Sequence, residues 1–161
     1  MTMEWDFVRI ALVLVAVALL LSAGIEDART REIANRKSAA LVLLAPLWWW
    51  ANGATLWPAV PLQLALSLAA LGVFAFAFHI GAMGGGDVKL IAALSLRLPL
   101  QLFATMLVVM SLAGGAVTLA MIVERRLKRG DPAGAVEVPY GVAIAIAGIL
   151  ALREPILNQF G

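Results

Sequence analysis

The sequence predicts an all-helical membrane protein with about six transmembrane helices, one of them short. The first observation is composition: 63% of the 161 residues are hydrophobic and 14% are charged, whereas soluble domains are about half apolar and a quarter charged. The second is that the apolar residues gather in runs, several of which reach the ~20 residues needed to cross a bilayer. No polar stretch is long enough for a soluble domain, so residues 1–161 are expected to form one integral membrane domain.

Six apolar runs give the expected helices. They are Phe7–Ile25, Ser38–Trp50 with a flank that reaches Trp57, Leu62–Ile80, Val88–Leu98, Leu100–Val123 and Tyr140–Leu157. The fourth run, at about 11 residues, is short for a span. Glu4 and Asp6 precede the first run, where a signal peptide would carry basic charge, so this run is expected to be a retained helix.

The basic residues predict the orientation of these helices. Nine of the 12 lysines and arginines fall in the connections on one side: Arg29, Arg31, Arg36, Lys37, Lys89, Arg125, Arg126, Lys128 and Arg129. The positive-inside rule then places Glu26–Lys37, Gly81–Asp87 and Glu124–Pro139 in the cytoplasm and both termini outside. It also requires the short fourth run to cross the membrane, or nearly so. Four tryptophans on the outer side are typical of interfacial anchors: Trp48, Trp49, Trp50 and Trp57.

Composition also excludes several kinds of site. The chain has no cysteine, which excludes disulfides, thiolate zinc sites and cysteine nucleophiles. A single histidine, His79, cannot form a histidine-rich metal site, so neither metal nor cofactor is expected. The pI near 9.5 is explained by membrane topology rather than by nucleic acid, so membrane lipid is an expected partner and nucleic acid is not.

Two aspartates at the same membrane face are the candidate chemical groups. Asp27 closes the first run, and Asp87 opens the fourth after Gly84, Gly85 and Gly86. Two carboxyl groups about 3 Å apart can share one proton, so that one activates water as a base and the other acts as an acid. Because Asp87 precedes a helix, whose dipole favours an anion, it is expected to be the more readily ionised partner. The glycines would permit positive φ and bring a peptide backbone close to the acid.

Simpler interpretations of these residues remain open. An aspartate at a helix end is usually a cap or a partner for arginine, and a glycine-rich turn is usually only a turn. A proton- or cation-coupled transport component could use Asp27 and Asp87 as carriers, although few ionisable residues lie at mid-membrane depth. A non-catalytic subunit of a pilus or secretion assembly would not need either aspartate.

Three segments, in order along the chain, resemble type IV prepilin peptidases. "DARTREIANRKSA" resembles their Asp-x-Arg-x-x-x-Ile-Pro-Asn segment after the first helix. "GAMGGGDVKLIAAL" resembles their Gly-x-Gly-Asp segment, which presenilin-type intramembrane proteases share. "VPYGVAIAIAG", Val138 to Gly148, resembles the start of their last helix. The likeness extends over nearly the whole chain.

The resemblance implies an aspartyl endopeptidase of the bacterial inner membrane. Its substrate would be a prepilin or pseudopilin, cut after a glycine at the cytoplasmic face, and its further partners would be pilus-assembly proteins. Asp27 and Asp87 match the two catalytic aspartates of the family. The resemblance assigns a substrate-binding or supporting role to Gly84, Gly85, Gly86, Arg29, Asn35 and Lys89.

The chain departs from the family pattern in two respects. Ala34 stands where the family usually has proline, which is expected to loosen the turn after the first helix. Larger members carry a cytoplasmic domain with a cysteine zinc site, linked to methylation of the new N-terminus. This chain resembles the short, peptidase-only members associated with Flp-type tight-adherence pili, and is expected to lack N-methyltransferase activity.

Overall fold

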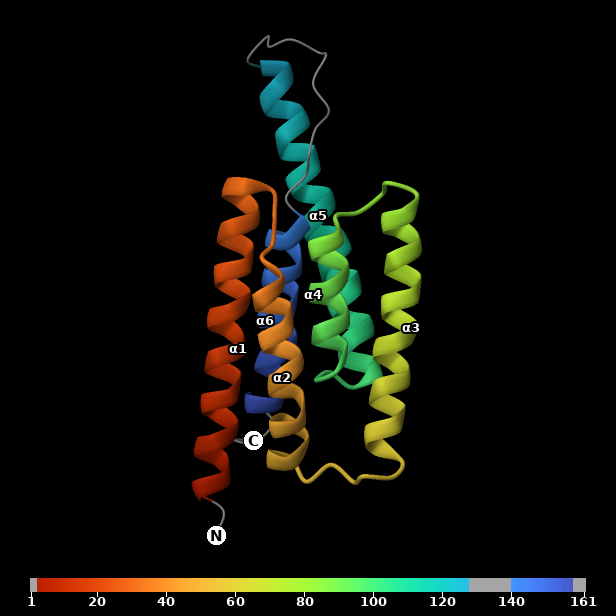
Figure 1. The fold of residues 1–161 in the computed structure, drawn as a ribbon. Helices are drawn as coiled ribbons and strands as arrows, with labels where there is room; N and C mark the ends of the chain where they lie inside the picture. Colours follow the sequence, from red (N-terminus) through yellow and green to blue (C-terminus); the bar gives the residue numbers. More distant parts are fainter. Residues whose placement is uncertain (1–2, 128–139, 158–161) are drawn as a thin grey trace.

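The computed structural model describes residues 3–127 and 140–157, and within them it contains six α-helices and no strand. The helices are α1 (Met3–Thr30), α2 (Asn35–Ala51), α3 (Ala59–His79), α4 (Gly85–Ser95), α5 (Leu100–Leu127) and α6 (Tyr140–Leu157). They run roughly along one axis, with the short α4 in the middle (Figure 1). The start of α1 and the end of α6 lie at the same end of the bundle (Figure 1). The predicted all-helical fold is confirmed.

Three helices are long and apolar enough to cross a membrane. These spans are Trp5–Thr30, Ala59–His79 and Leu100–Glu124. The apolar part of α6, Tyr140–Arg153, is shorter, and α2 and α4 have 17 and 11 residues. The structure therefore supports a membrane protein with several spans, while the number of six stays a prediction. The predicted basic connection Glu124–Pro139 lies, from residue 128 onward, outside the described residues.

The predicted end of the second helix is wrong. The apolar flank up to Trp57 is not helical, because α2 ends at Ala51 and Asn52 caps it with a backbone N–H to Trp48 O at 3.1 Å. The chain then turns through Gly53, whose φ of 64° lies in the left-handed region that favours glycine. Hydropathy alone does not show this turn, because the residues that follow it are still apolar.

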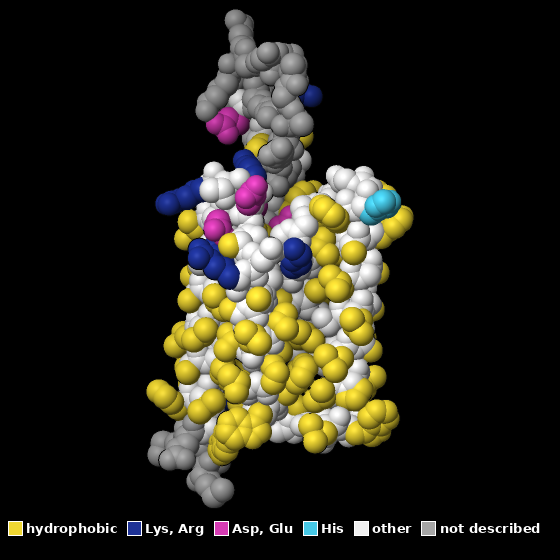
Figure 2. Space-filling model, viewed as in Figure 1, with side chains coloured by type: hydrophobic (Ala, Val, Ile, Leu, Met, Phe, Trp, Pro, Cys, Tyr) yellow, Lys and Arg dark blue, Asp and Glu magenta, His cyan; other side chains and the backbone are white. Residues whose placement is uncertain are grey.

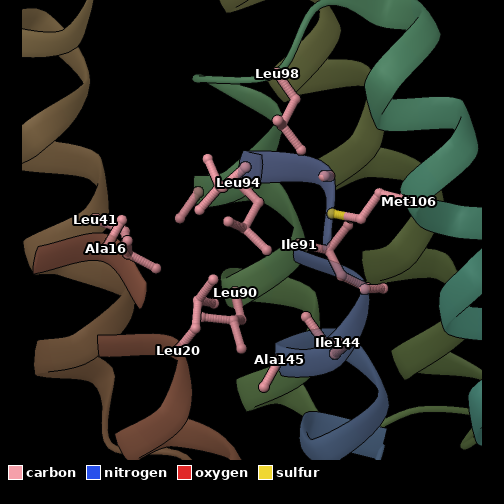
Figure 3. Packing of buried hydrophobic residues seen from close by; sticks show 14 of the residues in the cluster. Ala16, Leu20, Leu41, Leu90, Ile91, Leu94, Leu98, Met106, Ile144 and Ala145 are labelled. Atoms are coloured by element: carbon pink, nitrogen blue, oxygen red, sulfur yellow. The ribbon is translucent and has the colours of Figure 1, made fainter. Parts of the chain in front are cut away.

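The short helix α4 is the centre of the protein core. Most of its residues are buried, and the exposed Lys89 lies near its start. Figure 3 shows Leu90, Ile91 and Leu94 of α4 in one cluster with Leu20 of α1 and Ile144 of α6. Because other helices cover most of α4, its length does not have to match the thickness of the hydrocarbon core.

Side chains of neighbouring helices satisfy the backbone at the end of α4. The last carbonyls of a helix have no partner within it, and an unpaired carbonyl is costly where water is scarce. Three side chains supply the missing donors: Trp49 Nε1 to Leu96 O at 2.8 Å, Ser67 Oγ to Ala92 O at 2.8 Å, and Gln63 Nε2 to Leu98 O at 2.6 Å and to Ser95 O. The helix can therefore end inside the protein.

Two of the four predicted tryptophan anchors have a structural role instead. Trp48 is buried, and the Arg97 guanidinium lies 4.9 Å from the centre of its ring. Trp49 makes the hydrogen bond to Leu96 described above. Trp50 and Trp57 are 66% and 79% exposed, which fits the predicted interfacial position. The anchor interpretation is therefore wrong for Trp48 and Trp49.

Candidate active site

Asp27 is held by the backbone of α6. It lies in the last turn of α1 with 6% of its surface exposed, and its Oδ2 accepts a hydrogen bond of 2.8 Å from the Gly141 N–H. Gly141 is in the first turn of α6, where backbone N–H groups are unpaired and the helix dipole favours an anion. A Cβ at Gly141 would lie 2.8 Å from the Cβ of Asp27 and 2.8 Å from Cδ1 of Ile33. Only glycine allows this contact.

Asp87 occupies the first turn of α4, three residues after the N-cap Gly84. It is 7% exposed. The Gly84 backbone N–H stabilises its anion, as an acidic side chain at this position of a capping box does. Its Oδ1 is buried and has no hydrogen-bond partner among the described residues. Asp87 therefore has one oxygen free for a group that enters the site.

The two aspartates differ in their electrostatic surroundings. Asp87 lies outside the three long spans; burial and the nearby charge of Asp27 raise its pKa to about 7, against a smaller effect of the Gly84 N–H. A carboxyl group with a raised pKa keeps its proton to a higher pH than a free one does. Burial and a like charge thus act on Asp87 against the helix dipole, and the expectation that Asp87 is the more readily ionised of the two stays a prediction.

Both carboxyl groups face one cavity. It has a volume of about 220 Å³ and is lined by Asp27, Asp87, Gly84, Gly85, Gly86, Arg31, Glu32 and Ile33. The structure thus brings together two aspartates that are 60 positions apart in sequence. Figure 2 shows basic and acidic side chains gathered around this end of the bundle, above a largely hydrophobic body. The cavity therefore lies where the polar end of the protein meets its apolar part.

The three glycines act through close packing and not through positive φ. Gly84 is extended, with φ −72°, and Gly85 and Gly86 are already helical. The glycine with positive φ in this connection is Gly81, at 74°. A Cβ at Gly86 would lie 3.0 Å from the Cβ of Ile33. The expectation of positive φ is wrong for these three glycines. Gly86 packs closely on the chain that follows α1, whereas the docking of a peptide backbone beside the acid stays a prediction.

The other supporting residues lie outside the cavity. Lys89 Nζ donates to Asn35 Oδ1 at 2.8 Å and joins the start of α2 to α4. Arg29 is exposed on the last turn of α1. None of these three residues lines the cavity that holds the aspartates, so the structure does not bring them together with Asp27 and Asp87.

An ion pair that sequence analysis did not identify braces the cavity wall. Glu26 Oε2 lies 2.8 Å from Lys37 Nζ, which also donates to Ser22 O at 2.7 Å. The same Glu26 oxygen accepts from the Ala34 N–H at 3.0 Å. Proline has no N–H, so this hydrogen bond depends on alanine at the position where the family usually has proline. The expected loosening of the turn is offset by this contact.

The remaining missed residues are Gly141, Arg31, Glu32 and Ile33. A signal for Gly141 was present, because it lies in the segment that resembles the start of the family's last helix. Arg31, Glu32 and Ile33 lie in the segment that resembles the one after the family's first helix, where Ile33 matches the isoleucine of the pattern. Within the described residues, no cluster of three histidine, aspartate or glutamate side chains could hold a metal ion.

Together, the fold and the site define a helical membrane protein with two buried carboxyl groups facing one cavity. The family model described as the type IV leader peptidase family matches residues 14–119, a range that includes both aspartates and all three glycines. The chain belongs to this family, whose members are proteases that act on prepilins. Comparisons with curated proteins and with solved structures gave no significant match.

Proposed function

We propose that this protein is an aspartyl endopeptidase that cleaves the leader of Flp-type prepilins or pseudopilins after a glycine. It acts at the cytoplasmic face of the bacterial inner membrane and does not methylate the new N-terminus. The observation that carries the proposal is one cavity lined by both Asp27 and Asp87, of which Asp87 has a buried oxygen without a hydrogen-bond partner among the described residues.

The chemistry follows from the difference between the two carboxyl groups. Asp27, bonded to the Gly141 N–H, acts as the base and takes a proton from a water molecule. The water oxygen bonds to the scissile carbonyl carbon while protonated Asp87 donates to the carbonyl oxygen. When the intermediate collapses, the C–N bond breaks, the leaving nitrogen receives the proton that Asp27 took from water, and a hydroxyl group of the intermediate returns a proton to Asp87. The Gly141 N–H holds Asp27 in position, and the Gly84 N–H holds Asp87.

The shape of the cavity indicates how the substrate enters. An α-helix with side chains is about 10–12 Å wide, too wide for a cavity of about 220 Å³. The scissile segment must therefore be extended where it meets Asp27 and Asp87. A prepilin, with a basic leader before a long apolar helix, has its scissile bond at the membrane face, and this cavity lies at the charged end of the bundle (Figure 2).

Co-expression with a candidate prepilin tests the proposal. We expect Asp27→Asn and Asp87→Asn each to abolish the mobility shift that marks leader removal, while both proteins still insert in the membrane. Asp6→Asn is the matched control, because Asp6 pairs with Arg9 near the start of α1 and is far along the helix from the cavity. Leader removal by both active-site variants at the wild-type rate would contradict an aspartyl mechanism.

A further inference from the structure

A second cavity, apart from the one that holds the aspartates, opens between α2, α3 and α4. Its volume is about 470 Å³. It exists because α2 and α3 both pack on α4 but scarcely on each other. Most of its lining is apolar, including Val42 of α2, Leu64 and Leu68 of α3, and Leu96 directly after α4. Leu68 is 68% exposed, so the groove is open toward the space that membrane lipid would occupy.

One end of this groove carries three hydrogen-bond donors. Lys89 and Asn35, joined at 2.8 Å, are both exposed there. Ser38, one turn further along α2, is 5% exposed and lines the same groove, and its Oγ has no hydrogen-bond partner among the described residues. No carboxylate pairs with Lys89 in the described part of the chain. An ammonium, an amide and a hydroxyl together favour an anionic acceptor.

The lining changes from polar to apolar along the groove. On α2, Asn35 and Ser38 are followed one turn later by Val42. Lys89 of α4 is followed two turns later by Leu96, directly after the end of that helix. This order matches an amphiphile with an anionic head and a hydrocarbon tail. We propose that the groove binds one anionic phospholipid, with its phosphate at Lys89, Asn35 and Ser38 and an acyl chain along Leu64, Leu68 and Leu96.

The groove has room for an acyl chain, with a volume of about 470 Å³. Its change from a polar to an apolar lining favours an amphiphile over a peptide helix. A bound lipid would fill the gap between α2 and α3. Because Phe78 of α3 lies 3.4 Å from the Cβ position of Gly85, the lipid would also stabilise the packing beside the aspartates. The proposal does not depend on protease activity.

The test compares lipid retention by variants of the full chain. The proteins are reconstituted in nanodiscs of phosphatidylcholine and phosphatidylglycerol, extracted in detergent and examined by native mass spectrometry. We expect Lys89→Gln to weaken phosphatidylglycerol binding about fivefold, which corresponds to the ~1 kcal/mol that one basic residue contributes at an anionic membrane surface. Arg36→Gln is the matched control, because Arg36 is exposed in the same first turn of α2 but does not line the groove.

A second variant separates lipid binding from charge alone. Leu68→Trp fills the groove and leaves Lys89 intact, so it should also reduce phosphatidylglycerol retention. Addition of phosphatidylglycerol should raise the melting temperature of the wild type more than that of either variant, because a ligand stabilises the state that binds it. Equal retention by wild type and Lys89→Gln, or an equal loss in Arg36→Gln, would overturn the proposal. A photoreactive residue at position 68 that crosslinks to a peptide and not to phospholipid would also overturn it.

Discussion

The backbone N–H of Gly141 lies 2.8 Å from Oδ2 of Asp27, and no other residue type fits at position 141. A main-chain atom therefore sets the position of this carboxyl group. A main-chain donor has no side-chain rotamers, so its direction is fixed by the helix. Helix α6 is packed closely on α1, because a Cβ at Gly24 would lie 3.0 Å from the Cβ of Ala145. The carboxylate is thus oriented before any substrate arrives.

Gly141→Ala should consequently impair both activity and stability. The added methyl group would lie within 3 Å of Asp27 and Ile33, and α6 would have to move away. We expect a loss in kcat/KM of about 10²-fold, as a misplacement near 1 Å can cause, and a loss of ~1–3 kcal/mol in the free energy of unfolding. Gly115→Ala is the control, since nothing lies within 4 Å of its Cβ position on α5. Equal activity of the two variants would argue against the packing described here.

The raised pKa of Asp87 predicts a pH dependence of cleavage. Because its pKa is about 7, the acid loses its proton as the pH rises through 7, and the rate should fall there. In Asp27→Asn the neighbouring charge is absent, so the pKa of Asp87 should drop but stay above its ordinary value, because burial remains. A pH–rate profile of the wild type and a ¹³C NMR titration of Asp87 in Asp27→Asn measure these two effects. A rate that stays constant from pH 6 to about 9 would be inconsistent with Asp87 as the acid.

The raised pKa of Asp87 also makes the free energy of unfolding depend on pH. The folded-state pKa of Asp87, about 7, exceeds its ordinary value of 3.8. The stabilising contribution of its protonated form is therefore complete below pH 3.8 and is lost as the pH rises to about 7. Asp87→Asn, which stays neutral, should gain stability relative to the wild type over this interval and most above pH 7. Melting curves across this range provide the measurement, and parallel pH dependence in both proteins would contradict it.

Gln63 should be important for stability although it is remote from the aspartates. Its amide donates to the carbonyls of Ser95 and Leu98, where α4 ends inside the protein. Gln63→Leu leaves these carbonyls without that donor, and we expect a cost of ~1–3 kcal/mol in the free energy of unfolding. Thermal unfolding in detergent measures the effect. Gln101→Leu serves as the control, because Gln101 is exposed near the start of α5, and it should melt close to the wild type.

Lys37 should affect catalysis indirectly, by bracing the wall of the cavity. Lys37→Met removes the ion pair with Glu26 and the charged hydrogen bond to Ser22 O. We expect lower stability and a reduced rate of cleavage without complete loss. Adding Glu26→Gln to Lys37→Met should cost little more, because the two residues act as a pair. If the two substitutions instead have additive effects, the ion pair is not the brace.

Much of the fold could be predicted from hydropathy, because the apolar runs are separated by charges, glycines and prolines. The pairing of Asp27 with Asp87 could also be predicted, since charge bias placed both at one face. The raised pKa of Asp87 could not be predicted, because burial and a neighbouring charge depend on packing, whereas the helix dipole is read from local sequence. Trp48 was misinterpreted for a similar reason: its partner Arg97 is 49 positions away, and only the fold brings them together.

Because α4 is attached at both ends, its sequence tolerates substitutions better than insertions or deletions. Its first turn is packed on Ile33, and its last carbonyls are bonded to α2 and α3. One inserted or deleted residue between these attachments would rotate Asp87 by about 100° relative to the last turn. Either the hydrogen bonds at the end of α4 would then break, or Asp87 would no longer face the cavity that it shares with Asp27. The length of α4 is therefore under stronger constraint than the identity of the apolar residues within it.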